Sequence, residues 1–314
     1  MEVLTTEEID KAYKRIQSLI IKTPLISNER INNNTNSKVY FKLENLQKTG
    51  SFKIRGATNT ILQLSKEQLT NGVITTSSGN HGAAVASAAK KLGANVKVVM
   101  PDNTPKVKVD NVQRFGGEII FCDPNIKSRE NTLNKIVKED GSTIVHPYND
   151  EKIIAGQGTA AKELLEKIPD LDIIIAPVSG GGLLAGTLLA AKAINSNIKV
   201  YGAEPKNADD TYQSIKRKKI VPNKTTDTIA DGLRAQVGTI TFPIIQKHVD
   251  GIILVSEEMI IQSMRMVWQR LKIIIEPSCS IVLAAILTNK KQFYNKRIGL
   301  ILTGGNVDLD TLPW

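Results

Sequence analysis

The most informative residue of this sequence is Lys53. It lies in the run Lys48-Thr49-Gly50-Ser51-Phe52-Lys53-Ile54-Arg55-Gly56, from which the prediction of the fold starts. Thr49, Gly50 and Ser51 are typical of turns and helix caps, and apolar residues follow them at helical spacing. Lys53 is therefore expected in the first turn of a helix, beside the positive end of the helix dipole, where an ammonium is disfavoured. An amine that loses its proton easily is what a Schiff-base lysine requires, although a solvated surface lysine is the simpler alternative.

Size and composition are those of an ordinary globular chain. Of its 314 residues, 41% are hydrophobic and 23% are charged. This length is enough for two domains. The net charge of +10 invites a polyanion-binding interpretation, but the lysines are scattered and only 4% of the residues are aromatic. We therefore interpret the densest basic cluster, Lys216-Arg217-Lys218-Lys219, as a solvated loop or helix end and expect no nucleic-acid partner.

Cysteine use and the N-terminus point to a cytoplasmic protein. Cys122 and Cys279 cannot form a disulfide framework, and they show no metal-ligand spacing. The first eight residues lack the basic-then-apolar pattern of a signal peptide. No apolar stretch approaches the length of a bilayer span, so we expect no membrane partner.

From residue 72 onward, short β-rich runs alternate with helical segments. This alternation is typical of parallel sheets covered by helices, in which functional loops lie at the carboxyl ends of the strands. The expected strands are residues 73–76, 96–100, 118–121, 143–145, 173–177, 199–203, 252–255 and 297–302. The expected helices include residues 83–92, 106–115, 160–167, 183–194 and 259–271.

Three of these strands end in polar, glycine-rich turns. The turn at residues 77–82, Ser-Ser-Gly-Asn-His-Gly, carries more polar side chains than one helix cap needs, although capping is the simpler account. Residues 180–182 are consecutive glycines before a helix, so their backbone N–H groups suit a phosphate; a tight strand-to-helix turn is the alternative. The third turn, residues 303–306, follows the last strand.

The glycine turn also matches part of a dinucleotide-binding fingerprint. Gly180, Gly182 and Gly186 follow a strand, and Glu204 ends the next strand. This alternative predicts an NAD-dependent dehydrogenase. It leaves Lys53 and the turn at residues 77–82 without a role, and it remains open at this point.

The Lys53 run and the three turns together resemble the pyridoxal-phosphate (PLP) enzymes of the tryptophan-synthase-β type, known as fold type II. The motifs occur in that family's order, and the resemblance covers nearly the whole chain. It implies an α/β fold with two three-layer domains, each built on a parallel sheet. Residues 1–71 and 148–314 would form a large PLP-binding domain, and residues 72–147 a small inserted one. The resemblance also implies a homodimer.

Within this family the motifs are most similar to those of the serine racemases, next to the short serine/threonine dehydratases. The resemblance implies interconversion of L- and D-serine, with β-elimination of serine to pyruvate and ammonia as a second outcome. A catabolic L-threonine/L-serine dehydratase is the main alternative, because both activities use the same residues. A catalytically silent PLP-binding protein also stays open, although Lys53 and Ser78 are both present.

The resemblance assigns roles residue by residue. Lys53 carries the cofactor and acts as a base on one face of the substrate Cα, while Ser78 serves the opposite face. Thr303 offers a neutral hydroxyl to the pyridine nitrogen, so the ring is a weaker electron sink than it would be beside a carboxylate. The implied cofactor contacts are Phe52, Lys53, Asn80, Ser179, Gly180, Gly181, Gly182, Leu183, Gly232, Glu276 and Thr303. The implied substrate contacts are Ser77, Ser78, Asn80, His81 and Arg129.

The run at residues 203–210, Ala-Glu-Pro-Lys-Asn-Ala-Asp-Asp, resembles the divalent-cation site of the racemases. It implies ligation by the Glu204 carboxylate, the Ala208 carbonyl and the Asp210 carboxylate. Oxygen ligands suit Mg²⁺, Ca²⁺ or Mn²⁺ rather than zinc. A capped, acidic helix start is the alternative.

Some positions depart from the family's pattern. Ser179 replaces the first glycine of a four-glycine loop, but its backbone N–H remains. Cys279 stands where small residues are commoner, and it is interpreted either as a small core residue or as an oxidisable group near the cofactor. At the ATP site of animal racemases Lys48, Thr49 and Lys272 match, whereas Glu29, Arg30, Ala83 and Tyr148 do not, which gives ATP activation little support.

Overall fold

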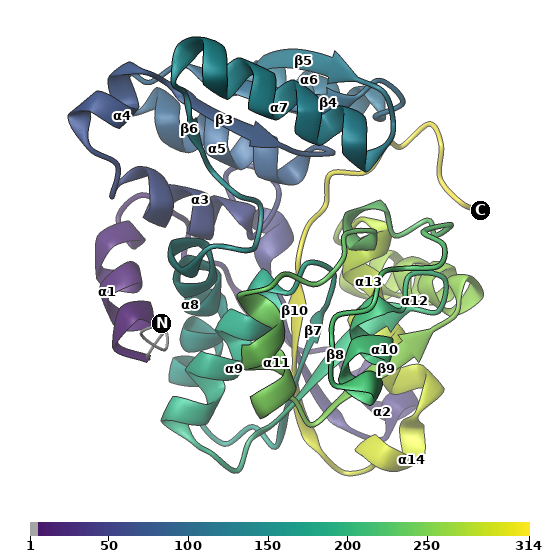
Figure 1. Cartoon of the computed structure of the whole chain (residues 1–314). Coiled ribbons are helices and arrows are strands. Elements are labelled where there is room, and N and C mark those ends of the chain that lie inside the picture. The colour runs from purple at the N-terminus through teal and green to yellow at the C-terminus, as the bar shows by residue number, and fades with distance from the viewer. Residues whose placement is uncertain (1–5) are drawn as a thin grey trace.

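The computed structural model describes residues 6–314. These residues form two separate sheets, and in the view of Figure 1 the smaller sheet lies above the larger one. The larger sheet has the order β1-β2-β10-β7-β8-β9 and the smaller one β5-β4-β3-β6. The larger sheet comprises β1 (Leu25–Ile26), β2 (Lys38–Leu43), β7 (Ile173–Pro177), β8 (Lys199–Pro205), β9 (Gly251–Val255) and β10 (Arg297–Leu302). The smaller sheet comprises β3 (Val73–Thr76), β4 (Val96–Pro101), β5 (Glu118–Cys122) and β6 (Thr143–Ile144).

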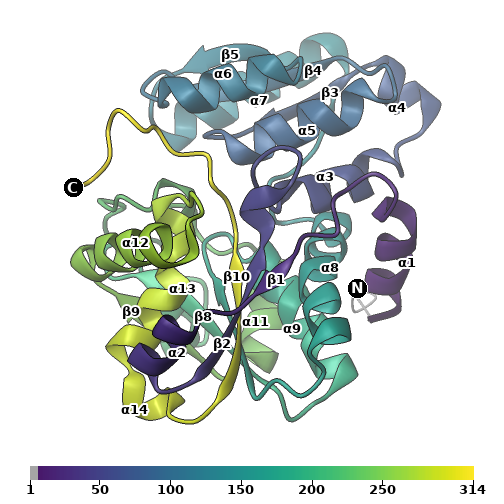
Figure 2. The ribbon, with the colours of Figure 1, turned by 180° about the vertical axis from the view of Figure 1, so that it is seen from behind.

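Helices cover both sheets, as Figure 2 shows from behind. Those before β7 are α1 (Thr6–Ile16), α2 (Glu29–Thr35), η1 (Glu44–Leu46), α3 (Lys53–Ile61), α4 (Lys66–Thr70), α5 (Asn80–Lys90), α6 (Lys106–Arg114), α7 (Ile126–Asp140) and α8 (Glu151–Lys167). Those after it are α9 (Gly182–Ile194), α10 (Asp210–Arg217), η2 (Asp231–Leu233), α11 (Thr241–His248), α12 (Glu257–Leu271), α13 (Pro277–Thr288) and α14 (Lys290–Phe293). Within residues 6–314, none of these helices has both the length and the apolar character needed to cross a bilayer.

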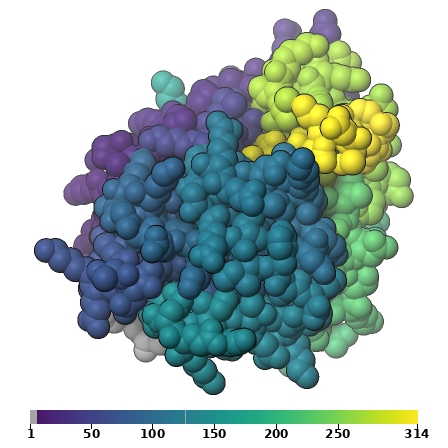
Figure 3. Space-filling model, turned by 90° about the horizontal axis from the view of Figure 1, so that it is seen from above, coloured from purple at the N-terminus to yellow at the C-terminus, as the bar shows by residue number. Residues whose placement is uncertain are grey.

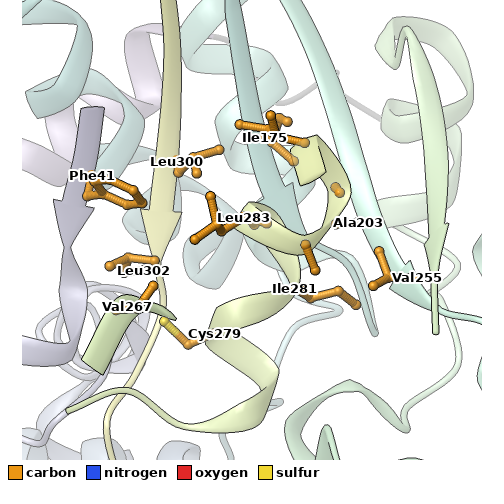
Figure 4. Packing of buried hydrophobic residues seen from close by; sticks show 14 of the residues in the cluster. Phe41, Ile175, Ala203, Val255, Val267, Cys279, Ile281, Leu283, Leu300 and Leu302 are labelled. Carbon is orange, nitrogen blue, oxygen red and sulfur yellow. The ribbon is translucent and has the colours of Figure 1, made fainter. Parts of the chain in front are cut away.

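Side chains of the larger sheet alternate between two cores, as the two-residue period of a strand requires. In β7, Ile173 and Ile175 join the core formed with α12 and α13, whereas Ile174 joins the core formed with α8 and α9. Figure 4 shows Ile175 and Leu283 of α13 in the first of these cores. The sheet is therefore the middle of three layers.

The smaller sheet is also covered on both faces. Val98 of β4 packs in a core with α5, and the next residue, Val99, packs on the other face with Leu133 of α7. Seen from above, the segment that contains this sheet covers most of the face, and the C-terminal residues lie at its edge (Figure 3).

The last strand lies in the interior of the larger sheet. β10 pairs in parallel with β2 on one side and with β7 on the other. The register aligns Leu302 at the end of β10 with Leu43 at the end of β2. Because the two strands end together, the turn after β10 lies beside the chain that leads from β2 to Lys53.

The predicted α/β class with parallel sheets is confirmed, and eight strands lie within two residues of their expected bounds. The prediction missed β1, which is antiparallel to β2, and β2 itself, whose Lys42 is buried rather than exposed. It also started α8 at residue 160 instead of Glu151. The helix is capped earlier, because the Asp150 carboxylate accepts from Ile153 N (3.0 Å). Gly156 interrupts the helical spacing of apolar residues, so the sequence did not indicate this first part of the helix.

Candidate active site

Lys53 is the first residue of α3, as predicted. The chain before it is held against the last turn, because Phe52 N donates to the Thr303 carbonyl oxygen (3.0 Å). Lys53 Nζ donates to the Pro147 carbonyl oxygen (2.8 Å) and lies 5.3 Å from the centre of the Phe52 ring. Burial lowers the pKa of Lys53 to about 8, against the opposing effect of the Glu276 carboxylate. The direction agrees with the sequence prediction, but burial is the main cause.

Helix α3 is held by four charged side chains that are almost inaccessible to solvent. Arg55 donates to both carboxylate oxygens of Glu44 (2.6 and 2.7 Å) and to both of Glu163 (2.8 and 3.0 Å). Lys42 Nζ donates to Glu163 Oε2 (2.5 Å). Such paired charges tie α3 to β2, η1 and α8, which fixes where Lys53 begins its helix. Sequence analysis missed this network, although Arg55 stood within the opening motif.

The turn at residues 77–82 follows β3 and leads into α5. The buried Ser77 hydroxyl oxygen accepts from Gly79 N (3.0 Å) and Gly82 N (2.9 Å), so this side chain caps the helix. The Ser78 side chain is exposed. Gly79 has a φ of +143°, a conformation that residues with a side chain rarely adopt. The turn therefore presents one free hydroxyl, that of Ser78, on a capped scaffold.

Asn80 connects this turn to the Lys53 run. Its amide nitrogen donates to Glu276 Oε1 (2.8 Å), and its amide oxygen accepts from Asn306 Nδ2 (2.8 Å). Asn306 Nδ2 also donates to the Thr49 carbonyl oxygen (2.9 Å). Three of the sequence motifs thus meet at one cluster of side-chain amides. Asn306 was not predicted as a site residue, although its place in the last polar turn was a usable signal.

The His81 ring, although part of this turn, lies against the backbone of another segment. Its Nε2 lies 3.2 Å from the Val145 carbonyl oxygen, an acceptor, so Nε2 carries the proton. Burial and the nearby Lys53 charge lower its pKa well below the usual value, so the ring is neutral. The buried Nδ1 has no partner within residues 6–314. The role in binding a substrate carboxylate that the resemblance implied for His81 stays a prediction.

The glycine loop lies at the start of α9. An added Cβ at Gly180 would lie 2.3 Å from Tyr148 Cγ, and Gly181 has a φ of +91°. The Ser179 hydroxyl accepts from Ala235 N (3.1 Å), which secures the loop, and Leu183 is buried below it. A helix N-terminus that opens with glycines, whose backbone N–H groups carry no side chains of their own beside them, has the geometry of a phosphate cradle.

Two of the remaining expected cofactor contacts are bound to site residues already described: the Thr303 carbonyl oxygen accepts from Phe52 N, and Glu276 Oε1 accepts from Asn80. Thr303 is buried, and Gly232 N donates to the Ser278 hydroxyl (2.9 Å) beside Glu276. Burial raises the pKa of Glu276 to about 7, while the Lys108 ammonium acts in the opposite direction. Glu276 therefore changes its charge near neutral pH, close to the lysine amine.

Arg129 lies on α7, and no described hydrogen bond or ion pair joins its side chain to the turn at residues 77–82. Its backbone N–H donates to the Asn125 carbonyl oxygen (3.2 Å), whereas its side chain forms no ion pair or hydrogen bond within residues 6–314. Its charge lowers the pKa of Tyr148, although burial raises that pKa overall. Arg129 thus acts electrostatically on the residue that covers the glycine loop.

The acidic run starts α10. Glu204 accepts from the backbone N–H groups of Thr211 (3.0 Å) and Tyr212 (2.9 Å), and Asp210 accepts from Val237 N (2.7 Å). Both carboxyl groups are buried, and neither has a cationic partner in residues 6–314. No group of three metal-ligating Asp, Glu, His or Cys side chains occurs in these residues. A helix start capped by Glu204 is therefore present.

Cys279 lies in the core formed with α12 and α13, as Figure 4 shows. It is inaccessible to solvent, and burial raises the pKa of its thiol strongly. A protonated, enclosed thiol supports its interpretation as a small core residue.

Comparisons with known proteins agree with this geometry. A serine racemase of Dictyostelium discoideum is 46% identical, over 99% of this chain and 98% of its own. The structure of maize serine racemase superposes with a TM-score of 0.96 at 46% identity, over 99% of this chain and 96% of the other. A β-hydroxyaspartate dehydratase of Paracoccus denitrificans (strain Pd 1222) is 43% identical over the full length of both chains.

The dehydrogenase alternative is wrong. It required Glu204 to be free for a ribose hydroxyl, but that carboxylate is buried and bound to two backbone N–H groups. The sequence model of the family described as "Pyridoxal-phosphate dependent enzyme" matches residues 16–304. This match, on a chain that has both a lysine of lowered pKa and a glycine loop at a helix start, shows that the protein belongs to the family of pyridoxal-phosphate-dependent enzymes.

Proposed function

We propose that the protein interconverts L- and D-serine and also eliminates water from serine to give pyruvate and ammonia. The observation that carries the proposal is the pairing of two groups suited to proton transfer. Lys53 has a pKa lowered to about 8, and Ser78 presents an exposed hydroxyl on a separate turn. Asn80 and Asn306 link the turn to the Lys53 run. The relatives that racemise serine support this assignment.

The residues present fit pyridoxal phosphate. The cradle at Gly180–Gly182 has no room for side chains and suits the phosphate, while Lys53, Phe52 and Thr303 lie together at the other end of the site. Asn80, Ser179, Leu183, Gly232 and Glu276 complete the proposed contacts. Bound to Lys53, the cofactor supplies an electron sink that makes the substrate Cα–H acidic.

Two side chains then handle the proton of Cα. Lys53 Nζ removes it on one face, and the Ser78 hydroxyl returns one on the other, which inverts the configuration. When the hydroxyl on Cβ leaves instead, the products are pyruvate and ammonia. The Ser77 hydroxyl and the Asn80 amide are proposed to bind the substrate carboxylate, together with His81 and Arg129.

We further propose that residues 72–147 form the inserted domain and close over the substrate, excluding water. The strands of the smaller sheet all come from this segment, which supports the boundaries. We also propose a cytoplasmic location, supported by the two free cysteines, Cys122 and Cys279. Few of the residues expected at an ATP site are present, so the proposal leaves ATP out.

A divalent cation is proposed at Glu204, Ala208 and Asp210. Two buried carboxyl groups lie together here without a cationic side chain, and burial raises the pKa of Glu204 well above its usual range. A bound Mg²⁺, Ca²⁺ or Mn²⁺ would offset this buried charge, and carboxylate and carbonyl oxygens are suitable ligands. The cation would stabilise the start of α10, outside the chemistry at Lys53.

A homodimer is proposed as the assembly. Leu46 and Ile274 are exposed apolar residues, and the amide of Asn45 joins their segments by donating to the Ile274 carbonyl oxygen (3.0 Å). Apolar surface of this kind is commonly covered in dimers. Sedimentation equilibrium of the protein and of Ile274→Asp tests the assembly: the variant should dissociate at concentrations where the parent protein is dimeric.

Racemisation is tested with L-serine and Mg²⁺ by following D-serine and pyruvate together. We expect both products from the parent protein, and Ser78→Ala should abolish D-serine while some pyruvate formation survives. The control is Ser196→Ala, because Ser196 is an exposed loop serine. If only pyruvate forms and Ser78→Ala leaves it unchanged, the protein is a serine/threonine dehydratase instead.

A second candidate function is dehydration of β-hydroxyaspartate. The full-length dehydratase relative suggests it, and the half-buried Arg129, which has no carboxylate partner in residues 6–314, offers a charge for a second carboxylate. Comparing kcat/KM for serine and for β-hydroxyaspartate distinguishes the two. Arg129→Met should reduce the activity on the dicarboxylate substrate more than the activity on serine if this candidate is correct.

A further inference from the structure

The side chain of Lys108, on α6, reaches from residues 72–147 to η2 and to the start of α13. That side chain is only 5% exposed. Its ammonium donates to Asp231 Oδ2 in η2 and lies 3.6 Å from Glu276 Oε2, at the start of α13. Neither this lysine nor Asp231 was predicted as a site residue. The contact joins two parts of the chain that approach each other only in the folded protein.

The alkyl chain of Lys108 packs on the serine turn. A Cβ added at Gly79 would lie 2.6 Å from Lys108 Cδ and 2.8 Å from its Cβ. The lysine therefore fills the space that a side chain at position 79 would need, directly beside Ser78. Two kinds of contact thus hold the turn: the hydrogen bonds that the Ser77 hydroxyl accepts from Gly79 and Gly82, and the packing of the Lys108 alkyl chain on Gly79.

Two carboxylates, those of Asp231 and Glu276, neutralise the ammonium of Lys108. Burial alone would lower its pKa, but the Glu276 and Asp231 carboxylates raise that pKa overall, so the ammonium stays protonated at neutral pH. Glu276 Oε1 accepts from Asn80, while Oε2 has no hydrogen-bond partner in residues 6–314 and faces Lys108. Glu276 is thus held between two residues of the inserted segment.

We propose that Lys108 is a positioning residue that holds the turn bearing Ser78 against Glu276 and Asp231, and thereby favours racemisation over elimination. The inference rests on the proposed function. Ser78 is needed only for proton transfer on the face opposite Lys53, whereas elimination uses Lys53, which is anchored separately by Arg55. Loosening the turn therefore affects one product more than the other.

The test uses the cofactor-loaded protein with the substitution Lys108→Met. The methionine keeps most of the alkyl packing and removes the charge. We expect the ratio of D-serine to pyruvate to fall about tenfold or more, because misplacing a catalytic group by about 1 Å can cost about a hundredfold in rate. Lys106→Met is the matched control, since Lys106 lies on the same helix and is exposed. Lys108→Arg should restore much of the ratio.

A second measurement does not depend on activity. Amide hydrogen exchange at residues 77–82 should be faster in Lys108→Met than in Lys106→Met. Should Lys108→Met not fold, Asp231→Asn replaces it, and the ratio and the exchange should change in the same direction.

An unchanged ratio with equal loss of both products, or unchanged exchange in the turn, overturns the proposal, because Lys108 then has only a structural role. If the parent protein forms no D-serine at all, the proposed racemase function fails. The exchange measurement still decides, in that case, whether Lys108 holds the turn.

Discussion

Replacing Arg55 with methionine tests how α3, and with it Lys53, is held in place. In the folded protein two cations, Arg55 and Lys42, neutralise two carboxylates, Glu44 and Glu163, and all four side chains are almost fully buried. The substitution removes five hydrogen bonds from the guanidinium, four of them to carboxylate oxygens and one to Thr159 Oγ1. It leaves one buried lysine facing two carboxylates.

The expected loss of unfolding free energy is about 4 kcal/mol, since removing one partner of a buried ion pair costs about 3–5 kcal/mol. Arg297→Met is the matched control. Arg297 also binds a carboxylate, that of Asp170 (2.7 Å), but both side chains are open to solvent, with exposed fractions of 32% and 66%, and such a pair is worth about 0–1 kcal/mol. Urea unfolding at equal cofactor saturation measures both variants. With a slope of about 3 kcal/mol per molar urea, the Arg55 variant should lose about 1 M in its midpoint.

The penalty should also depend on pH. In the parent protein burial raises the pKa of Glu44, but Arg55 and its other partners lower it overall, so Glu44 contributes stability at neutral pH that is lost as the pH falls. Removing Arg55 takes away the largest effect that lowers the pKa of Glu44, so the burial effect should raise that pKa and ionisation should then oppose folding. The difference between variant and parent should therefore be larger at pH 8 than at pH 5. A loss below about 1 kcal/mol, equal to that of the control, would refute the reasoning.

Three further predictions concern the site. Because burial lowers the pKa of Lys53 to about 8, the cofactor-free protein should react with pyridoxal phosphate faster as the pH rises and level off above about 8; a rate independent of pH between 6 and 10 contradicts this. Gly180→Ala should weaken cofactor binding about tenfold or more in a fluorescence titration, because its Cβ would meet Tyr148, and adding Tyr148→Ala should recover part of the loss. Cys279 should react with a thiol reagent only at the rate of unfolding, whereas rapid labelling of the native protein would show that its thiol is accessible.

Much of the architecture follows from local patterns. The alternation of strands and helices predicted the α/β class and the bounds of eight strands, because burial on both faces of a parallel sheet leaves apolar runs between helices. The first turn of α3 and the helix start after the glycine loop were also predicted. The predicted boundaries were wrong where the apolar pattern was interrupted. Glycines interrupt it in α8, and the buried Lys42 interrupts it in β2.

The candidate site was predicted in its parts rather than in its connections. The residues of each polar turn were identified, but the roles of His81 and Arg129 stay predictions. The His81 ring lies against the Val145 carbonyl oxygen, and Arg129 lies on α7, outside the turn. The partners of Asn80 were not foreseeable. One of them, Glu276, lies 196 positions further along the chain, and no periodicity connects the two.

The sequence by itself determined that a lysine opens a helix, that a polar turn follows a strand and that a glycine loop opens another helix. Each of these depends on contacts within a few residues, which local composition controls. Only the tertiary structure decided which groups meet. The position of β10 between β2 and β7 brings Thr303 to Phe52, and the approach of α6 to η2 and to the start of α13 brings Lys108 to Glu276. These contacts depend on strand order and burial, which join distant residues without leaving a local pattern.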